Sequence, residues 1–199
     1  MLVFCGTGAI VINDVSDGVV GHGGVAITFG LIVAVVIYAF GGLSGAHINP
    51  AVSIAFSVLG LFQKREVLPY VFAQLTGAVL ASLVVYLLFP AHQSLGGTIP
   101  SGSVSQSFIL ELILTYILML VILLVSQQQD VKQLTGFVVG GVVLLEAWFA
   151  GPVCGASMNP ARSIGPAVIS ANYTALHVYV IAPVIGAVGA SFTWKYLKT

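Results

Sequence analysis

Charged side chains are scarce in this sequence. Its 199 residues include only six lysines and arginines and six aspartates and glutamates, or 6% of the chain, whereas 58% of the residues are hydrophobic. A soluble domain carries charge on about a quarter of its residues, so the composition predicts an integral membrane protein surrounded by lipid. The formal net charge of zero excludes the basic surface that a nucleic-acid partner would need.

Cysteine is also scarce, and the residue patterns of enzymes are missing. The two cysteines, Cys5 and Cys154, are too few for a disulfide framework or a metal site, and we interpret them as apolar packing residues. The sequence has no Ser/His/Asp set, phosphate-binding loop or metal-ligand cluster. We therefore expect neither an enzyme nor a bound cofactor.

Long apolar runs, in contrast, are abundant. Five are long enough to span a bilayer, which takes roughly 17–25 residues in a helix. These five runs cover residues 25–42, 67–89, 107–126, 133–150 and 175–195. A sixth run, 1–12, would reach about 18 Å as a helix and lacks the basic start of a signal peptide. We expect it to be a first transmembrane helix that is truncated at its N-terminus, which gives six transmembrane helices.

The basic residues predict an orientation in the membrane. Five of the six fall on one side of a six-span chain, and the side rich in lysine and arginine is the cytoplasm. These five are Lys64, Arg65, Lys132, Lys195 and Lys198. We therefore expect a multi-pass protein of the plasma (cell inner) membrane with a cytoplasmic C-terminus. Arg162 stands alone toward the other side.

Two ten-residue segments are near copies of each other. Residues 44–53 read SGAHINPAVS and residues 154–163 read CGASMNPARS, so six of the ten positions are identical at an offset of 110. Much of segment 70–82 also recurs at 179–191. A membrane chain that repeats a helix-breaking motif in both halves is expected to build a site from two broken helices.

Each predicted half contains three spans and one interruption. Because three is odd, the second half crosses the membrane in the opposite sense, as in an inverted repeat. The sequence predicts an all-α membrane protein with one channel domain, 1–199, whose repeat halves are 1–89 and 107–199. Two re-entrant half-helices, at about 50–60 and 160–170, would meet near the membrane midplane.

Each triplet, Asn49-Pro50-Ala51 and Asn159-Pro160-Ala161, suits the start of a helix. The proline fits the first turn, where no backbone donor is needed, and the asparagine precedes it at the N-cap. The positive ends of both half-helices would then face the membrane centre. A single Asn-Pro-Ala is typical of an ordinary loop, but two copies in an inverted repeat favour a shared site.

At these residues the chain resembles the aquaporin (major intrinsic protein) family. The two repeats look like that family's signature loops, and Glu111 with Thr115 looks like its Glu-x-x-x-Thr motif. The family's other such glutamate would lie before Met1. The run 149–167 is especially similar to prokaryotic and nodulin-type members. The resemblance implies a homotetramer of passive channels that conduct water and small uncharged solutes while excluding protons and ions.

The resemblance also implies roles for individual residues. Asn49 and Asn159 would donate hydrogen bonds to a permeating oxygen and so interrupt a chain of hydrogen-bonded water. Arg162 would repel cations at an outer constriction. The other residues lining that constriction would be Phe29, Ala147 and Ala156.

The sequence leaves the solute open. Strict water channels of the family typically carry histidine where Ala147 stands, and a methyl group there widens the opening and removes a donor. Ser163 and Ala167 match the water-channel pattern, whereas Tyr179 and Val180 look more like glycerol facilitators and nodulin-type members. The alternative is therefore an aquaglyceroporin-type channel, mainly for glycerol or other small neutral solutes.

Polar residues inside apolar runs carry further predictions, since they are costly in a membrane unless bonded or facing water. Glu111 is expected to accept hydrogen bonds from the backbone of a re-entrant loop. Glu146 is expected to be a buried acceptor or to approach the constriction, and His47 to line the pore. The segment 94–107 is expected to be an outer connecting loop. The remaining histidines are expected in solvated outer regions: His22, His92 and His177.

Two other classes of protein stay open. A secondary transporter with broken helices would need an acidic or cationic coupling site at the midplane, where this chain has paired asparagines. Its sign would be saturable, gradient-coupled uptake. A structural membrane protein that keeps the fold but conducts poorly would have no use for both asparagines and Arg162.

Overall fold

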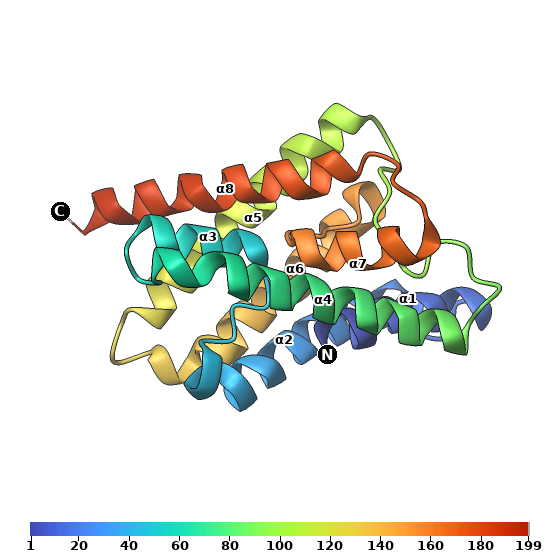
Figure 1. The fold of residues 1–199 in the computed structure, drawn as a ribbon, viewed down its shortest axis with the longest axis horizontal. Coiled ribbons are helices and arrows are strands. Elements are labelled where there is room, and N and C mark those ends of the chain that lie inside the picture. Colours follow the sequence, from blue (N-terminus) through green and yellow to red (C-terminus); the bar gives the residue numbers. More distant parts are fainter. Residues whose placement is uncertain (199) are drawn as a thin grey trace.

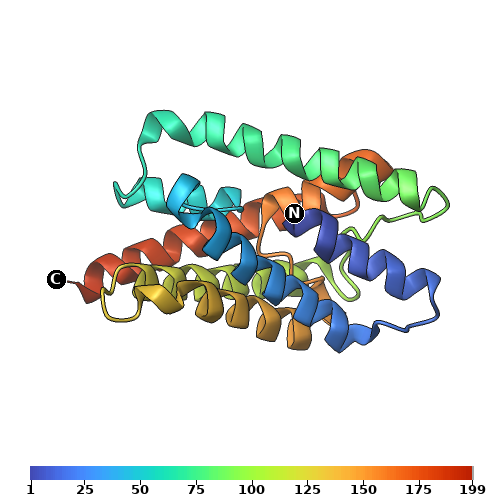
Figure 2. The ribbon, with the colours of Figure 1, turned by 90° about the horizontal axis from the view of Figure 1, so that it is seen from below.

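The computed structural model describes residues 1–198 as a bundle of helices that lie side by side (Figures 1 and 2). In chain order they are α1 (Leu2–Val15), α2 (Gly21–Ser44), α3 (Pro50–Val58), α4 (Lys64–Leu88), α5 (Val104–Ser126), the 3-10 turn η1 (Lys132–Leu134), α6 (Thr135–Cys154), α7 (Pro160–Ser170) and α8 (Leu176–Leu197). No strand occurs in this part of the chain. The fold is all-α, as the sequence predicts.

Within residues 1–198, five helical segments are long and apolar enough to cross a membrane. They are α2, α4, α5, α8 and the combined segment of η1 and α6. The helix α1 is apolar but has only 14 residues, and the N-terminus lies near the middle of the molecule's long axis (Figure 2). The predicted runs match these helical segments to within four residues at either end.

The helices α2 and α6 end at equivalent positions of the repeat. The predicted runs 25–42 and 133–150 end too early, because α2 and α6 continue to Ser44 and Cys154. Both helices stop at a glycine in the left-handed conformation, Gly45 with φ 77° and Gly155 with φ 83°. Glycine adopts this conformation without the steric cost that a Cβ brings, so each helix ends where its signature loop begins.

Small residues let the long helices pack closely. Gly30 of α2 and Gly140 of α6 face each other, and a Cβ on Gly30 would lie 2.6 Å from the carbonyl oxygen of Gly140. Gly186 of α8 lies against the backbone of α5 at Leu112 in the same way. Small residues at such crossings allow backbones to approach within the membrane.

The two half-helices α3 and α7 enter the bundle from opposite ends (Figure 1). They pack against equivalent helices of the opposite repeat. On one side, Ser191 Oγ of α8 donates to the carbonyl oxygen of Ala55, at 3.3 Å. On the other, Gly165 of α7 lies so close to Ala78 that a Cβ would be 2.7 Å from the Ala78 carbonyl oxygen. The starts of both half-helices are thereby held in the interior.

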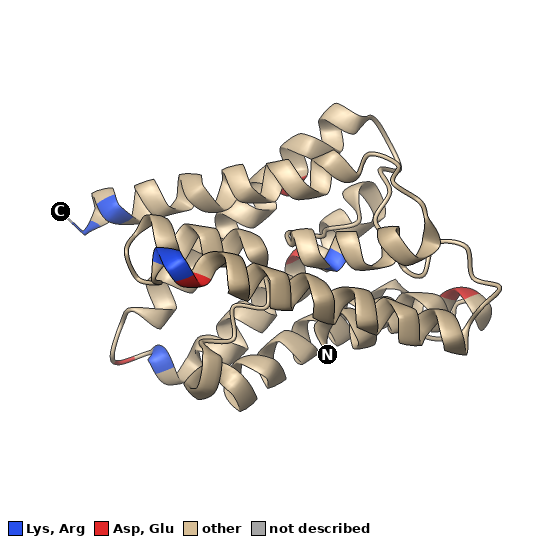
Figure 3. Ribbon diagram, in the orientation of Figure 1, with Lys and Arg blue, Asp and Glu red and all other residues tan. Residues whose placement is uncertain are grey.

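The outward faces of the long helices are apolar. Several large side chains on them are more than half exposed: Leu31, Leu68, Phe72, Leu87, Phe137 and Phe192. An apolar surface this extensive is unfavourable in water and marks a multi-pass integral membrane protein. Lysine and arginine gather at the end where the C-terminus lies, apart from one turn of α7 in the middle of the molecule (Figure 3).

A fully buried carboxylate on α5 holds the loop before α7. Glu111 Oε1 accepts a hydrogen bond from the backbone N–H of Ser157, and Oε2 accepts one from that of Met158, both at 2.7 Å. Non-helical backbone at membrane depth has no bulk water to satisfy it. Glu111 therefore supplies acceptors that the loop needs. Glu146 of α6 is also buried, but neither of its carboxyl oxygens has a hydrogen-bond partner among the described residues.

This contrast predicts different effects of two matched substitutions. Glu111→Gln keeps one acceptor oxygen and turns an amide donor toward the second backbone N–H, which should destabilise the fold by about 1–3 kcal/mol. Glu146→Gln should leave stability unchanged, because it breaks no bond and removes a chargeable group from the interior. Thermal unfolding of both purified variants in detergent measures the difference. Equal unfolding temperatures would contradict the proposed anchoring by Glu111.

Candidate functional site

The two signature loops have the same unusual backbone. Three positions in each loop adopt positive φ, which L-residues rarely do. They are Gly45, Ala46 and Ile48 in the first loop and Gly155, Ala156 and Met158 in the second. Positive φ at the non-glycine positions is energetically costly and persists only where the surroundings hold it. The equivalence of the loops therefore extends from their sequences to their backbone conformations.

The two asparagines tie the loops together reciprocally. Asn49 Nδ2 donates to the carbonyl oxygen of Met158 at 2.7 Å, and Asn159 Nδ2 donates to the carbonyl oxygen of Ile48 at 2.8 Å. Each bond joins one half of the chain to the other. The starts of α3 and α7 therefore lie tip to tip in the interior.

Each asparagine also caps its own half-helix. Asn49 Oδ1 accepts from the backbone N–H of Ala51 at 2.9 Å, and Asn159 Oδ1 accepts from that of Ala161 at 3.0 Å. An amide nitrogen carries two hydrogens, and only one on each asparagine has a protein acceptor in the described chain. Both asparagines line a cavity, so each can offer one donor to a molecule inside it.

Two cavities meet at three of the residues selected from the sequence. An inner cavity of about 110 Å³ is lined by both signature loops. A second cavity of about 290 Å³, here called the outer vestibule, is lined by the end of α1, the start of α2, the end of α6 and residues 97–99. The residues that line both are Phe29, Ala156 and Arg162. Ala147, the fourth, lines the vestibule. The structure thus brings the predicted constriction residues together where the cavities join.

Arg162 is held by uncharged partners. Its side chain is 3% exposed, and Nη1 donates to the carbonyl oxygen of Gly96 at 2.9 Å. Its guanidinium carbon lies 5.0 Å from the centre of the Phe29 ring, within the range of a cation–π contact. No carboxylate lies within salt-bridge distance of Arg162 in the part of the chain described. Glu111 interacts with Arg162 electrostatically over a longer distance, so the positive charge stands beside the junction of the cavities without a direct ion pair.

His47 lines the inner cavity, within a group of aromatic rings. The centres of the Phe56, Phe62 and Tyr70 rings lie 4.8–5.0 Å from that of its imidazole. His47 Nδ1 also lies 3.0 Å from Ser53 Oγ. These contacts fix the orientation of the imidazole ring at the place where the first signature loop lines the inner cavity. Glu146, in contrast, lines neither cavity.

The outer loop between α4 and α5, residues 89–103, makes contacts that were not predicted from the sequence. Gly96 holds Arg162, and Thr98 Oγ1 donates to Ser163 Oγ at 2.7 Å. Two histidines assigned to solvated regions are also engaged: His22 lines the vestibule beside the carbonyl oxygen of Trp148, and His92 is paired with Asp14. The only sequence signal was the glycine pair at 96–97, which marked a turn without indicating its partner.

Comparisons with known proteins agree with this geometry. The Major intrinsic protein family matches residues 1–194. Aquaporin NIP1-1 of Zea mays is 46% identical over 199 residues, which cover 99% of this chain and 71% of that protein. Nodulin-26 of Glycine max is 39% identical over 99% of this chain and 73% of its own length.

A solved structure has the same fold. The aquaglyceroporin from Plasmodium falciparum superimposes with a TM-score of 0.88 at 31% identity, covering 98% of this chain and 91% of that one. Taken with the sequence relatives, the paired Asn-Pro-Ala helix starts and the joined cavities identify the chain as a member of the major intrinsic protein family, a family of transport channels.

Proposed function

We propose that this protein is a passive channel that conducts water and small uncharged solutes across a membrane and excludes protons and ions. One observation carries the proposal: the inner cavity and the vestibule meet at Phe29, Ala156 and Arg162, so a path is lined from the signature loops to the outer end. The names of its relatives, an aquaporin and an aquaglyceroporin, support a channel for molecules of this kind.

Water would pass the two asparagines in single file. A water oxygen that accepts the free N–H donors of Asn49 and Asn159 has its acceptor sites occupied, and its own hydrogens then point toward neighbouring waters on either side. Proton hopping needs a continuous chain of equally oriented hydrogen bonds, and this orientation breaks it. The asparagine pair therefore favours water transfer without proton transfer.

Ions would meet two positive regions. The N-terminal ends of α3 and α7 each act as roughly half a positive charge, and they face the same point in the interior. Arg162 adds a positive charge at the junction of the cavities, with no direct ion pair to a carboxylate among the described residues. A cation would lose its hydration shell in a narrow path and receive only repulsion in exchange.

The size of the constriction limits which solutes can pass. Ala147 contributes only a methyl group beside the vestibule, so the opening is wider than one lined by a larger side chain. A second candidate function follows from this small side chain and from the aquaglyceroporin relative: a channel mainly for glycerol or other small neutral solutes.

The surroundings of the channel are also part of the proposal. The chain would be one channel domain, with repeat halves 1–89 and 107–199, in the plasma (cell inner) membrane. The basic end of the molecule would face the cytoplasm, together with the C-terminus. Four copies would lie side by side in lipid, as in a homotetramer. On α4, the open space beside Gly77 and the exposed Phe72 leave room for a neighbouring chain.

Stopped-flow light scattering on proteoliposomes tests the proposed function. Vesicles containing the protein should shrink faster in sucrose than empty vesicles, and re-swelling in glycerol reports entry of the solute. Fast shrinkage with slow re-swelling identifies a water channel, and fast re-swelling identifies the second candidate. Rates equal to those of empty vesicles would refute both, and uptake that saturates and needs an ion gradient would favour a transporter.

Substitution of Ala147 tests the role of the constriction. Ala147→His adds both volume and a hydrogen-bond donor beside Arg162, and should reduce glycerol entry about tenfold or more while water flow persists. Ala147→Val adds volume with no donor, so it separates the two effects. The same re-swelling assay measures both variants. Glycerol entry unchanged in both would mean that Ala147 does not face the path.

A further inference from the structure

A turn in the outer loop presents the carbonyl group that holds Arg162. Within it, Leu95 and Gly96 both adopt positive φ, 51° and 70°. The side chain of Leu95 is fully buried and packs against Val11 of α1 and Val85 of α4. The backbone of Gly96 lies against Thr7, since a Cβ on Gly96 would be 2.7 Å from the Thr7 carbonyl oxygen.

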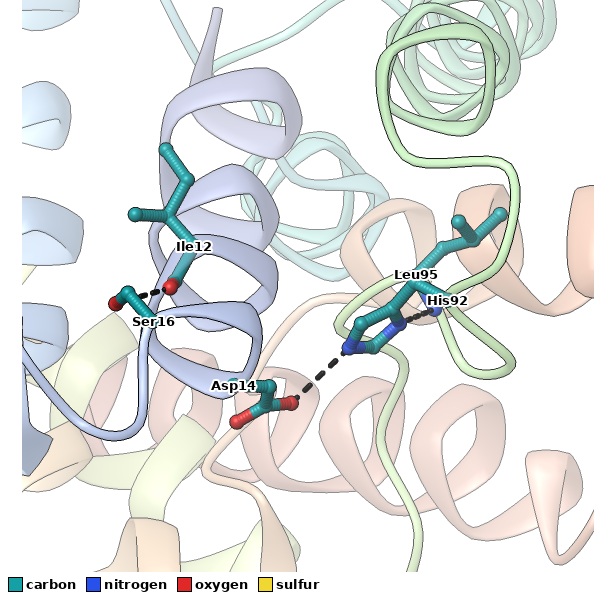
Figure 4. Close-up of polar contacts among 5 residues, drawn as sticks. All are labelled: Ile12, Asp14, Ser16, His92 and Leu95. Atoms are coloured by element: carbon teal, nitrogen blue, oxygen red, sulfur yellow. Dashed lines mark hydrogen bonds and ion pairs between the residues drawn. The ribbon is translucent and has the colours of Figure 1, made fainter.

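The ring of His92 joins this turn to the end of α1 (Figure 4). Its Nδ1 lies 3.0 Å from the backbone nitrogen of Leu95, and its Nε2 lies 3.1 Å from Asp14 Oδ2. The Leu95 N–H can only donate, so Nδ1 accepts and Nε2 carries the ring proton and donates to Asp14. The His92 side chain is 11% exposed. A single imidazole thus links a carboxylate on α1 to the residue next to Gly96.

The position of Arg162 depends on the same turn. Nη1 of Arg162 has the Gly96 carbonyl oxygen as its hydrogen-bond partner, and Nε has none in the described chain. The first repeat has Val52 where the second has Arg162, so no symmetry-related contact supports this side chain. A shift of the Gly96 carbonyl would therefore release the guanidinium group from its place beside Phe29.

We propose that His92, oriented by Asp14, is a positioning residue that sets the solute selectivity of the channel. It holds the Leu95–Gly96 turn, and the turn fixes Arg162 at the junction of the two cavities. This inference rests on the proposed function. When the hydrogen bond from the Leu95 N–H to His92 Nδ1 is lost, Arg162 moves away from the junction and the opening admits larger neutral solutes. Glycerol entry then rises relative to water flow.

Three substitutions of His92 separate its two hydrogen bonds. His92→Ala removes both. His92→Asn keeps an acceptor oxygen at the position of Nδ1, so it retains the bond from Leu95 without reaching Asp14. His92→Gln keeps a donor near the position of Nε2, so it can reach Asp14 but cannot accept from Leu95. The matched control is His177→Ala, since His177 is another histidine beside the outer end and its side chain is exposed.

The test compares glycerol entry with water flow for each variant in the same proteoliposomes. We expect the glycerol-to-water ratio to rise about two- to tenfold in His92→Ala and His92→Gln, the effect of one hydrogen bond. His92→Asn should restore the wild-type ratio, and His177→Ala should not alter it. An unchanged ratio in His92→Ala, or a His92→Asn ratio equal to that of His92→Ala, overturns the inference.

Hydrogen exchange separates this inference from the proposed function. The Leu95 amide should be protected in the wild-type protein and in His92→Asn, and should exchange faster in His92→Ala. Exchange that is unaffected by His92→Ala overturns the inference even where no flow is measurable. A wild-type protein that conducts no more than empty vesicles refutes the proposed function, while the exchange result still decides whether His92 holds the turn.

Discussion

The reciprocal hydrogen bonds between the two signature loops are the contact on which the rest of this structure depends. Asn49 donates to Met158, and Asn159 donates to Ile48, so neither loop can keep its place without the other. Backbone outside a helix is tolerated at membrane depth only where its polar groups are bonded or face a wet cavity. Here the asparagines and Glu111 supply the bonds, and the inner cavity lies against the loop segments.

Symmetry accounts for the centre of the molecule, and asymmetry accounts for its outer end. The capped half-helices, the left-handed loop residues and the facing glycines Gly30 and Gly140 all follow the repeat. Arg162 has no counterpart in the first half. It is held by an outer loop that lies between the repeats, and that loop is fastened to α1. The features that would distinguish one solute from another are thus added to a symmetric core.

The sequence was sufficient to predict the central features because they repeat. The offset of 110 predicted two half-helices, and the observed starts at Pro50 and Pro160 match. The contact between the outer loop and Arg162 could not be predicted, because Gly96 acts through its carbonyl oxygen and carries no side chain to signal a role. His92 pairs with Asp14 across 78 residues, a contact that no local pattern reveals. The surroundings of Glu146 could not be predicted either, because the pattern of a helix that is apolar all round does not indicate which face is buried.

Proton flux through the wild-type channel, measured while it carries water, shows whether the paired asparagines separate the two kinds of transfer. Proteoliposomes with a pH-sensitive dye inside would be exposed in parallel experiments to an osmotic step and to a pH step with a membrane potential. We expect water flow well above that of empty vesicles and proton flux equal to theirs. Proton flux that rises with the amount of protein, alongside water flow, would contradict the claim that the paired asparagines interrupt the water chain.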